Sequence, residues 1–102
     1  MFGNLKIDIT MIDYSGYPAY ATFGFVDSNG KEIIVVEKLD ILTSNYNITF
    51  PTTGFFLKCK ILENREDVVL IDISKPYGVL SINNECIFSV SKEIISEKHF
   101  DD

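Results

Sequence analysis

The stretch that decides the fold is Gly54–Ser74, which reads GFFLKCKILENREDVVLIDIS. In its first half, four apolar side chains fall on one face of an extended chain, namely Phe55, Leu57, Cys59 and Ile61. After the polar turn Asn64–Asp67, the second half repeats the pattern with Val69, Ile71 and Ile73. A period of two is typical of β-strands that bury one face. The stretch therefore predicts a long β-hairpin at the centre of an all-β domain.

The remaining chain adds shorter strands separated by turn residues. We predict strands over Asn4–Ile12 (a candidate edge strand), Ala19–Val26, Glu32–Lys38 (central or doubly covered, with Leu39–Leu42 continuing past a kink), Val79–Ile82 and Cys86–Val90. Asn29-Gly30 supplies the positive φ values of a tight hairpin turn, and Gly24 indicates a bulge or bend. Ser91–Asp102 forms a last strand or a short helix. The sequence thus predicts a single domain, 1–102, of about seven antiparallel strands in a β-sandwich or partly open barrel, with at most a short C-terminal helix.

Composition and charge narrow the classes of partner. The chain has 102 residues, 15 of them acidic and 9 basic, so its formal net charge is −6. An acidic surface repels phosphate backbones, and we therefore expect no direct contact with nucleic acid. Neither a secretory signal nor an apolar run long enough for a membrane helix is present, which predicts a cytoplasmic protein without membrane contact. In that reducing compartment Cys59 and Cys86 are expected to be buried free thiols, although a disulfide is possible if their strands face each other.

Catalytic and metal-binding patterns are missing from the sequence. The only histidine, His99, lies three residues from the end, and two cysteines 27 positions apart do not make a set of zinc ligands. No glycine-rich phosphate motif occurs. Strand-borne carboxylates, such as Asp8, Glu37 and Asp72, could converge in a cleft, but solvent-facing carboxylates are much commoner. We therefore predict no catalytic residue, no metal, no cofactor and no enzymatic activity.

A binding role has more candidate residues. Tyrosines cluster around the Gly16/Pro18 loop, and others lie in separate polar loops, while carboxylates gather at the central hairpin turn. Tyrosine gives a large contact area and a hydroxyl at low entropic cost, although tyrosines also cover the ends of cores. The predicted partner-binding residues are Asp13, Tyr14, Tyr17, Tyr20, Tyr46, Glu63, Glu66, Asp67 and Tyr77.

One family resemblance runs from about residue 19 to residue 90. The residues that carry it are Asp27-x-x-Gly30, Glu37-Lys38, Phe50-Pro51-x-x-Gly54, Cys59, Asp72, Pro76-x-Gly78 and Phe88-x-Val90. This arrangement resembles small bacterial all-β proteins that give immunity to polymorphic or contact-dependent-inhibition toxins. Its motifs are turn and core residues, so the resemblance implies a fold and no particular contact residues.

Three functions follow as hypotheses. The first is a cytosolic immunity or inhibitor protein that binds a basic toxin domain, such as a nuclease, and blocks its active site or substrate groove. This hypothesis loses most of its support if the acidic and tyrosine-bearing loops lie on opposite ends of the domain with no shared patch. The alternative is a small β-barrel that binds a small ligand in an apolar pocket. A third, an OB-like nucleic-acid binder, needs a basic face with exposed aromatic residues, of which Lys58 and Lys60 offer a fragment.

Overall fold

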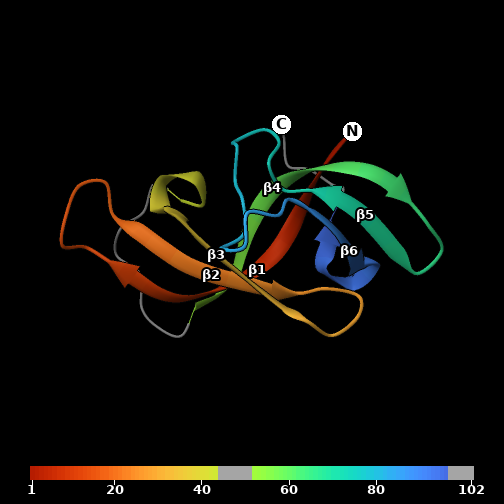
Figure 1. Cartoon of the computed structure of the whole chain (residues 1–102), viewed down its shortest axis with the longest axis horizontal. Helices are drawn as coiled ribbons and strands as arrows, with labels where there is room; N and C mark the ends of the chain where they lie inside the picture. The colour runs from red at the N-terminus through yellow and green to blue at the C-terminus, as the bar shows by residue number, and fades with distance from the viewer. Residues whose placement is uncertain (44–51, 97–102) are drawn as a thin grey trace.

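The computed structural model describes residues 1–43 and 52–96 and confirms an all-β fold. Its elements are β1 (Phe2–Asp13), β2 (Tyr20–Val26), β3 (Glu32–Lys38), the 3-10 helix η1 (Leu39–Ile41), β4 (Thr52–Asn64), β5 (Val68–Asp72), β6 (Ile87–Ser91), the 3-10 helix η2 (Lys92–Ile94) and β7 (Ile95–Ser96). The strands form one antiparallel sheet in the order β3-β2-β1-β4-β5-β6, and β7 also pairs with β1 (Figure 1).

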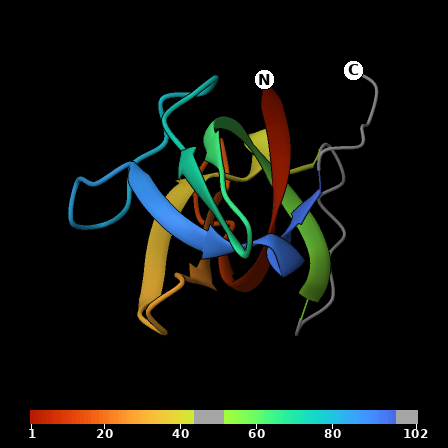
Figure 2. The same ribbon diagram turned by 90° about the vertical axis from the view of Figure 1, so that its right-hand side faces the viewer.

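The sheet curls into a partly open barrel because both of its outer parts return toward the middle (Figure 2). β1 pairs with β4 along one edge, while its other edge pairs with β7 at Asn4–Leu5 and with β2 from Asp8 onward. Register shifts occur in the β1–β2, β1–β4 and β4–β5 pairs. Such bulges bend a strand and increase its twist, which lets a single sheet wrap around a core.

The core follows the alternation that the sequence predicted. One face of each long strand is buried, and Leu57, Cys59 and Ile71 have no exposed surface. Phe25 and Phe88 meet edge to face at 5.4 Å between ring centroids, which joins β2 to β6 across the interior. A backbone hydrogen bond from Ser28 N–H to the Ser89 carbonyl, 2.7 Å long, ties the β2–β3 turn to β6. The predicted hairpin Gly54–Ser74 is confirmed as β4 and β5.

The positions of two strands differ from the prediction. β1, predicted as an edge strand, lies in the middle of the sheet, because its two halves use different partners. β3, predicted as central or doubly covered, ends the strand order, and its outer edge is covered where Ile82 N–H donates to the Ile34 carbonyl at 2.9 Å. Ile33 and Val35 on its inner face are buried, whereas Val36 on its outer face is 47% exposed.

Two predicted strand segments are wrong. Leu39–Leu42 turns into η1 instead of continuing β3, and Leu39 N–H donates to the Ala19 carbonyl at 2.9 Å. Val79–Ile82 is irregular, although Val79 is completely buried, because its backbone closes a turn in which Ser81 N–H donates to the Glu85 carbonyl. In each segment the first apolar residue, Leu39 or Val79, is buried without strand pairing, whereas Leu80 and Ile82 are exposed.

The glycines of the first hairpin act differently from the prediction. Gly30 has φ +81°, but Asn29 is outside the positive-φ region, and Asp27 Oδ1 accepts hydrogen bonds from the N–H groups of Asn29 and Lys31. The turn is therefore a longer loop closed by one left-handed glycine. Gly24 is needed for close approach, since a Cβ there would lie 2.7 Å from the Ile33 carbonyl oxygen. The bulge predicted near Gly24 lies instead in β1 between Ile9 and Met11, opposite Phe23 and Thr22.

Candidate functional site

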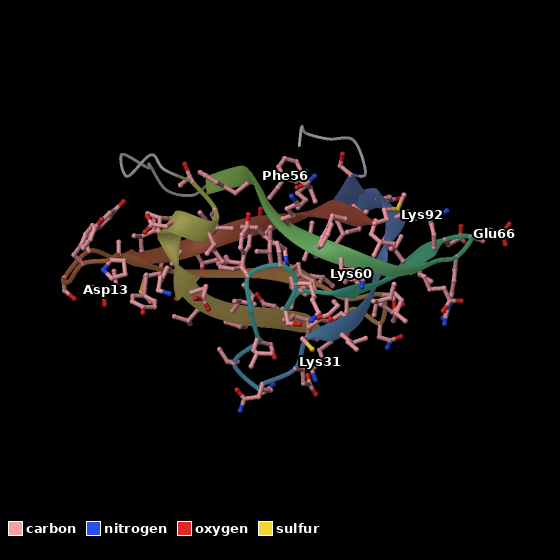
Figure 3. All side chains as sticks on the ribbon, turned by 90° about the horizontal axis from the view of Figure 1, so that it is seen from above. Asp13, Lys31, Phe56, Lys60, Glu66 and Lys92 are labelled. Carbon is pink, nitrogen blue, oxygen red and sulfur yellow. The ribbon has the colours of Figure 1, made fainter. Side chains whose placement is uncertain are left out.

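The predicted partner-binding residues fall into separate places. Asp13 and Glu66 mark opposite ends of the long axis, which measures 42 Å (Figure 3). Asp13, Tyr14, Tyr17 and Tyr20 lie at the β1–β2 end, whereas Glu63, Glu66 and Asp67 lie at the β4–β5 turn. Tyr77 belongs to the β5–β6 connection, and Tyr46 lies outside the described residues. The acidic turn and the tyrosine-bearing loop therefore share no surface, so the inhibitor hypothesis loses the support of a shared patch and keeps only the tyrosine-bearing loop as its candidate contact surface.

The β1–β2 end nevertheless gathers exposed apolar side chains. On the outer face, strand pairing places Met11, Thr22 and Val36 side by side across β1, β2 and β3, a row that we call a rung. The next rung with outward-facing side chains consists of Asp13, Tyr20 and Lys38. Met11 is 58% exposed, Val36 47% and Tyr17 90%. We call Met11, Tyr14, Tyr17, Tyr20 and Val36 the tyrosine end. Clustered exposed apolar residues of this kind mark interaction sites on soluble proteins.

A local hydrogen bond orders the loop that carries the tyrosines. Ser15 N–H donates to Asp13 Oδ1 at 2.8 Å, so the side chain of Asp13 closes a short turn at the end of β1. Hydrogen bonds from the Ser15 hydroxyl and N–H lower the pKa of Asp13, which keeps the carboxylate charged. This end thus presents a fixed negative charge beside exposed aromatic rings, a combination suited to a protein partner.

A second surface, which the sequence shows only in part, covers the outside of β1 and β4. The register pairs Phe2 with Lys60, Asn4 with Lys58 and Lys6 with Phe56, and Lys58 Nζ lies 5.4 Å from the centroid of the Phe2 ring. We call Phe2, Lys6, Phe56, Lys58 and Lys60 the basic aromatic face. Lys58 and Lys60 were identified from the sequence, but their partners from β1 were missed, because strand register between distant segments is not visible in the sequence.

Among residues 1–43 and 52–96, side chains fill the barrel interior, and this part of the chain shows no apolar pocket of the kind that the ligand-binding hypothesis predicts. Fully buried side chains from every long strand fill the interior, and Phe23, Leu39 and Val79 close it from different elements. Two grooves, of about 490 Å³ and 130 Å³, open on the outside of β1 and β2 around Asp8 and Gly24. Lys6 and Asp8 line the larger groove, Asp8 and Glu32 line the smaller one, and both grooves are open to solvent.

The candidate carboxylates do not converge. Asp8, Glu37 and Asp72 lie on β1, β3 and β5, and at least one other strand separates each from the next. Asp72 is only 9% exposed and accepts hydrogen bonds from both the N–H and the hydroxyl of Ser74, at 2.9 and 2.6 Å. The hydroxyl of Ser74 is the main reason that the pKa of Asp72 is lowered. This carboxylate closes a turn at the end of β5, which is a structural role.

The two cysteines lie on either side of that carboxylate. Cys59 is buried, Cys86 is half-buried, and both are free thiols, as predicted. The Cys86 thiol hydrogen-bonds to Asp72, and burial together with the nearby Asp72 charge raises the pKa of Cys59 to about 12. A thiol with so high a pKa is a poor nucleophile at neutral pH.

Within residues 1–43 and 52–96, no group of three or more metal-ligating side chains is present, and no helix could cross a membrane. His99 lies outside the described residues. No family model, no curated protein and no solved structure matches the chain. The resemblance to toxin-immunity proteins therefore stays a prediction, and the candidate surfaces rest on the geometry described above.

Proposed function

We propose that this chain is a non-enzymatic binding protein that engages a protein partner through its tyrosine end. The observation that carries the proposal is the exposed rung Met11–Thr22–Val36 next to the tyrosine-bearing loop. Aromatic residues and methionine are enriched in interface cores, and tyrosine in particular buries a large area at low entropic cost. A stable interface needs roughly 800 Å² on each partner. This is about an eighth of the 6047 Å² surface, which one end of an elongated domain can supply.

The partner class that we propose is a basic toxin domain, such as a nuclease, neutralised in the cytoplasm by an immunity-type protein. The support is the net charge of −6, the family resemblance and the fixed carboxylate of Asp13 within the tyrosine end. The remote acidic turn contributes long-range attraction instead of contact, because opposite charge accelerates encounter even when it lies outside the interface. Within that turn Glu63 already pairs with Arg65 at 2.9 Å, which leaves Glu66 and Asp67 as the steering charges.

The first experiment is co-purification of the tagged chain with the products of neighbouring open reading frames, followed by mass spectrometry. The expected result is one basic partner at near-equal stoichiometry, released at high salt. The variant Tyr17→Ala/Tyr20→Thr should weaken the complex at least 30-fold, since central aromatic residues act as hot spots. Tyr77→Ala, which removes a half-exposed tyrosine elsewhere, is the matched control and should bind normally.

A second pair of variants separates contact from steering. Glu66→Gln/Asp67→Asn should slow association at low salt and leave the dissociation rate unchanged, whereas the tyrosine variant should raise the dissociation rate. Binding that survives the tyrosine variant but disappears with the Glu66/Asp67 variant would refute the proposed interface.

A further inference from the structure

We propose that the basic aromatic face of β1 and β4 binds single-stranded nucleic acid. This surface differs from the tyrosine end, so the inference stands independently of the proposed function. It also revises the expectation, based on net charge, that the chain makes no contact with nucleic acid.

The arrangement of the face supplies both elements that single strands require. Lys58 and Lys60 are neighbours on the outer side of β4, and β1 adds Lys6 from the adjacent strand. Phe2 lies opposite Lys60 and Phe56 lies opposite Lys6, so the two rings occupy diagonal corners of the face. Proteins that bind single strands without sequence preference combine positive charge along the backbone with aromatic rings on which bases stack. Open sheets with outward aromatic residues provide that platform in RNA-binding domains.

Geometry also spaces the rings suitably. Outward side chains on one strand are about 6.7 Å apart. The pair Phe2–Lys60 and the pair Lys6–Phe56 are two such steps apart along the strands, with the pair Asn4–Lys58 between them. The face can therefore hold one base on each ring with a further nucleotide between them, while the lysines follow the phosphates. The Lys58 ammonium, 5.4 Å from the Phe2 centroid, places positive charge next to one stacking position.

The acidic net charge does not cancel this local field. At 0.1 M salt, charges more than about 10 Å apart are largely screened, so nearby carboxylates decide the potential of the face. Asp72 is paired with Lys60 in the register and stays charged, so it offsets Lys60, whereas the neutral Asn4 lies opposite Lys58. Glu63, farther along β4, is neutralised by Arg65. Asp8 lines a groove together with Lys6, so it offsets positive charge only at the Lys6 border of the face.

An acidic peptide is the competing partner for three lysines. The structure favours nucleic acid because Phe2 is 43% and Phe56 39% exposed beside the lysines, and aromatic rings stack with bases but give a carboxylate no hydrogen-bond donor. The Lys58 ammonium lies over the Phe2 ring.

The test is fluorescence anisotropy with a labelled oligothymidine of roughly 15 nucleotides, the length that one such module covers. Two to three neutralised phosphates predict a slope of log K against log salt of about −1.4 to −2.1, so affinity should fall about 7- to 18-fold between 50 and 200 mM salt. Lys58→Gln/Lys60→Gln should reduce the magnitude of the slope to about 0.7 or below. Phe2→Leu should weaken binding roughly 5- to 150-fold without changing the slope.

The matched control removes the same charge elsewhere. Lys31 and Lys38 are exposed on the β2–β3 hairpin, so Lys31→Gln/Lys38→Gln should leave both affinity and slope unchanged. Circular dichroism melts check that every variant is folded. Three results would each overturn the proposal: no binding of the oligothymidine at 50 mM salt, equal loss in the control variant, or equally tight binding of an oligoglutamate peptide.

Discussion

Replacing Val79 with alanine tests whether the irregular β5–β6 connection is part of the core. Val79 is completely buried, although its backbone belongs to no strand. The substitution removes two methyl-sized groups, worth about 0.8 kcal/mol each in transfer free energy. The unfilled space adds about 1 kcal/mol more. The free energy of unfolding should therefore fall by about 2–3 kcal/mol, a large part of the roughly 5–15 kcal/mol expected for a domain of this size.

The assay is urea unfolding followed by far-ultraviolet circular dichroism and tyrosine fluorescence, since the chain has five tyrosines and no tryptophan. The neighbouring variant Leu80→Ala is the control, because Leu80 is 41% exposed and its loss should change the free energy by no more than about 0.5 kcal/mol. Val79→Ala should lower the midpoint of unfolding without altering the m-value. A loss below about 1 kcal/mol, or an equal loss in Leu80→Ala, would refute the argument that the connection packs into the barrel.

Three further predictions follow from the described contacts. Gly24→Ala should destabilise the fold by about 1–3 kcal/mol in urea unfolding, because the new Cβ would press on the Ile33 carbonyl of β3. The control Gly16→Ala should change the free energy of unfolding little, because the space around Gly16 is open, and equal effects of the two variants would contradict the prediction. The lowered pKa of Asp72 means that its carboxylate stabilises the fold above the ordinary value of 3.8, and this contribution is lost as the pH falls through the native pKa. Asp72→Asn should thus cost about 2 kcal/mol at pH 7 and progressively less toward about pH 3, and a constant difference across that range would argue against it. At pH 8 a thiol reagent should modify Cys86 before Cys59, because Cys59 is buried and its pKa is about 12. Mass spectrometry of the partly modified protein identifies which cysteine reacts first, and earlier modification of Cys59 would contradict the prediction.

Much of the fold could be predicted because its strands bury one face each. The alternation of Leu57, Cys59 and Ile61 with polar neighbours specified the inward face of β4, and the polar turn at Asn64–Asp67 specified its end. These are local signals with a period of two, and they can be recognised in the sequence even when the partner strand is unknown. The same reasoning failed at Val79, where an apolar residue enters the core from a turn.

The candidate surfaces were harder to predict because they depend on pairing between distant segments. Nothing local in Phe2–Asp13 indicates that Phe2 lies opposite Lys60 or that Met11 aligns with a rung reaching Val36. A shift of one residue would send each of these side chains to the other face of the sheet. Residue types could therefore be assigned to a binding role from the sequence, whereas their grouping required the register.

The register also changes how the charge of the chain should be interpreted. A net charge of −6 describes the field far from the molecule, where individual faces merge. A partner in contact meets one face at a time, and on the basic aromatic face the lysines Lys6, Lys58 and Lys60 outnumber the adjacent carboxylates Asp8 and Asp72. Next to the tyrosine end, Asp13 shares a row with Tyr20 and Lys38, so charges of both signs lie there. One small acidic domain can thus present two surfaces of different chemistry, and the two sets of variants proposed above distinguish them because no residue belongs to both.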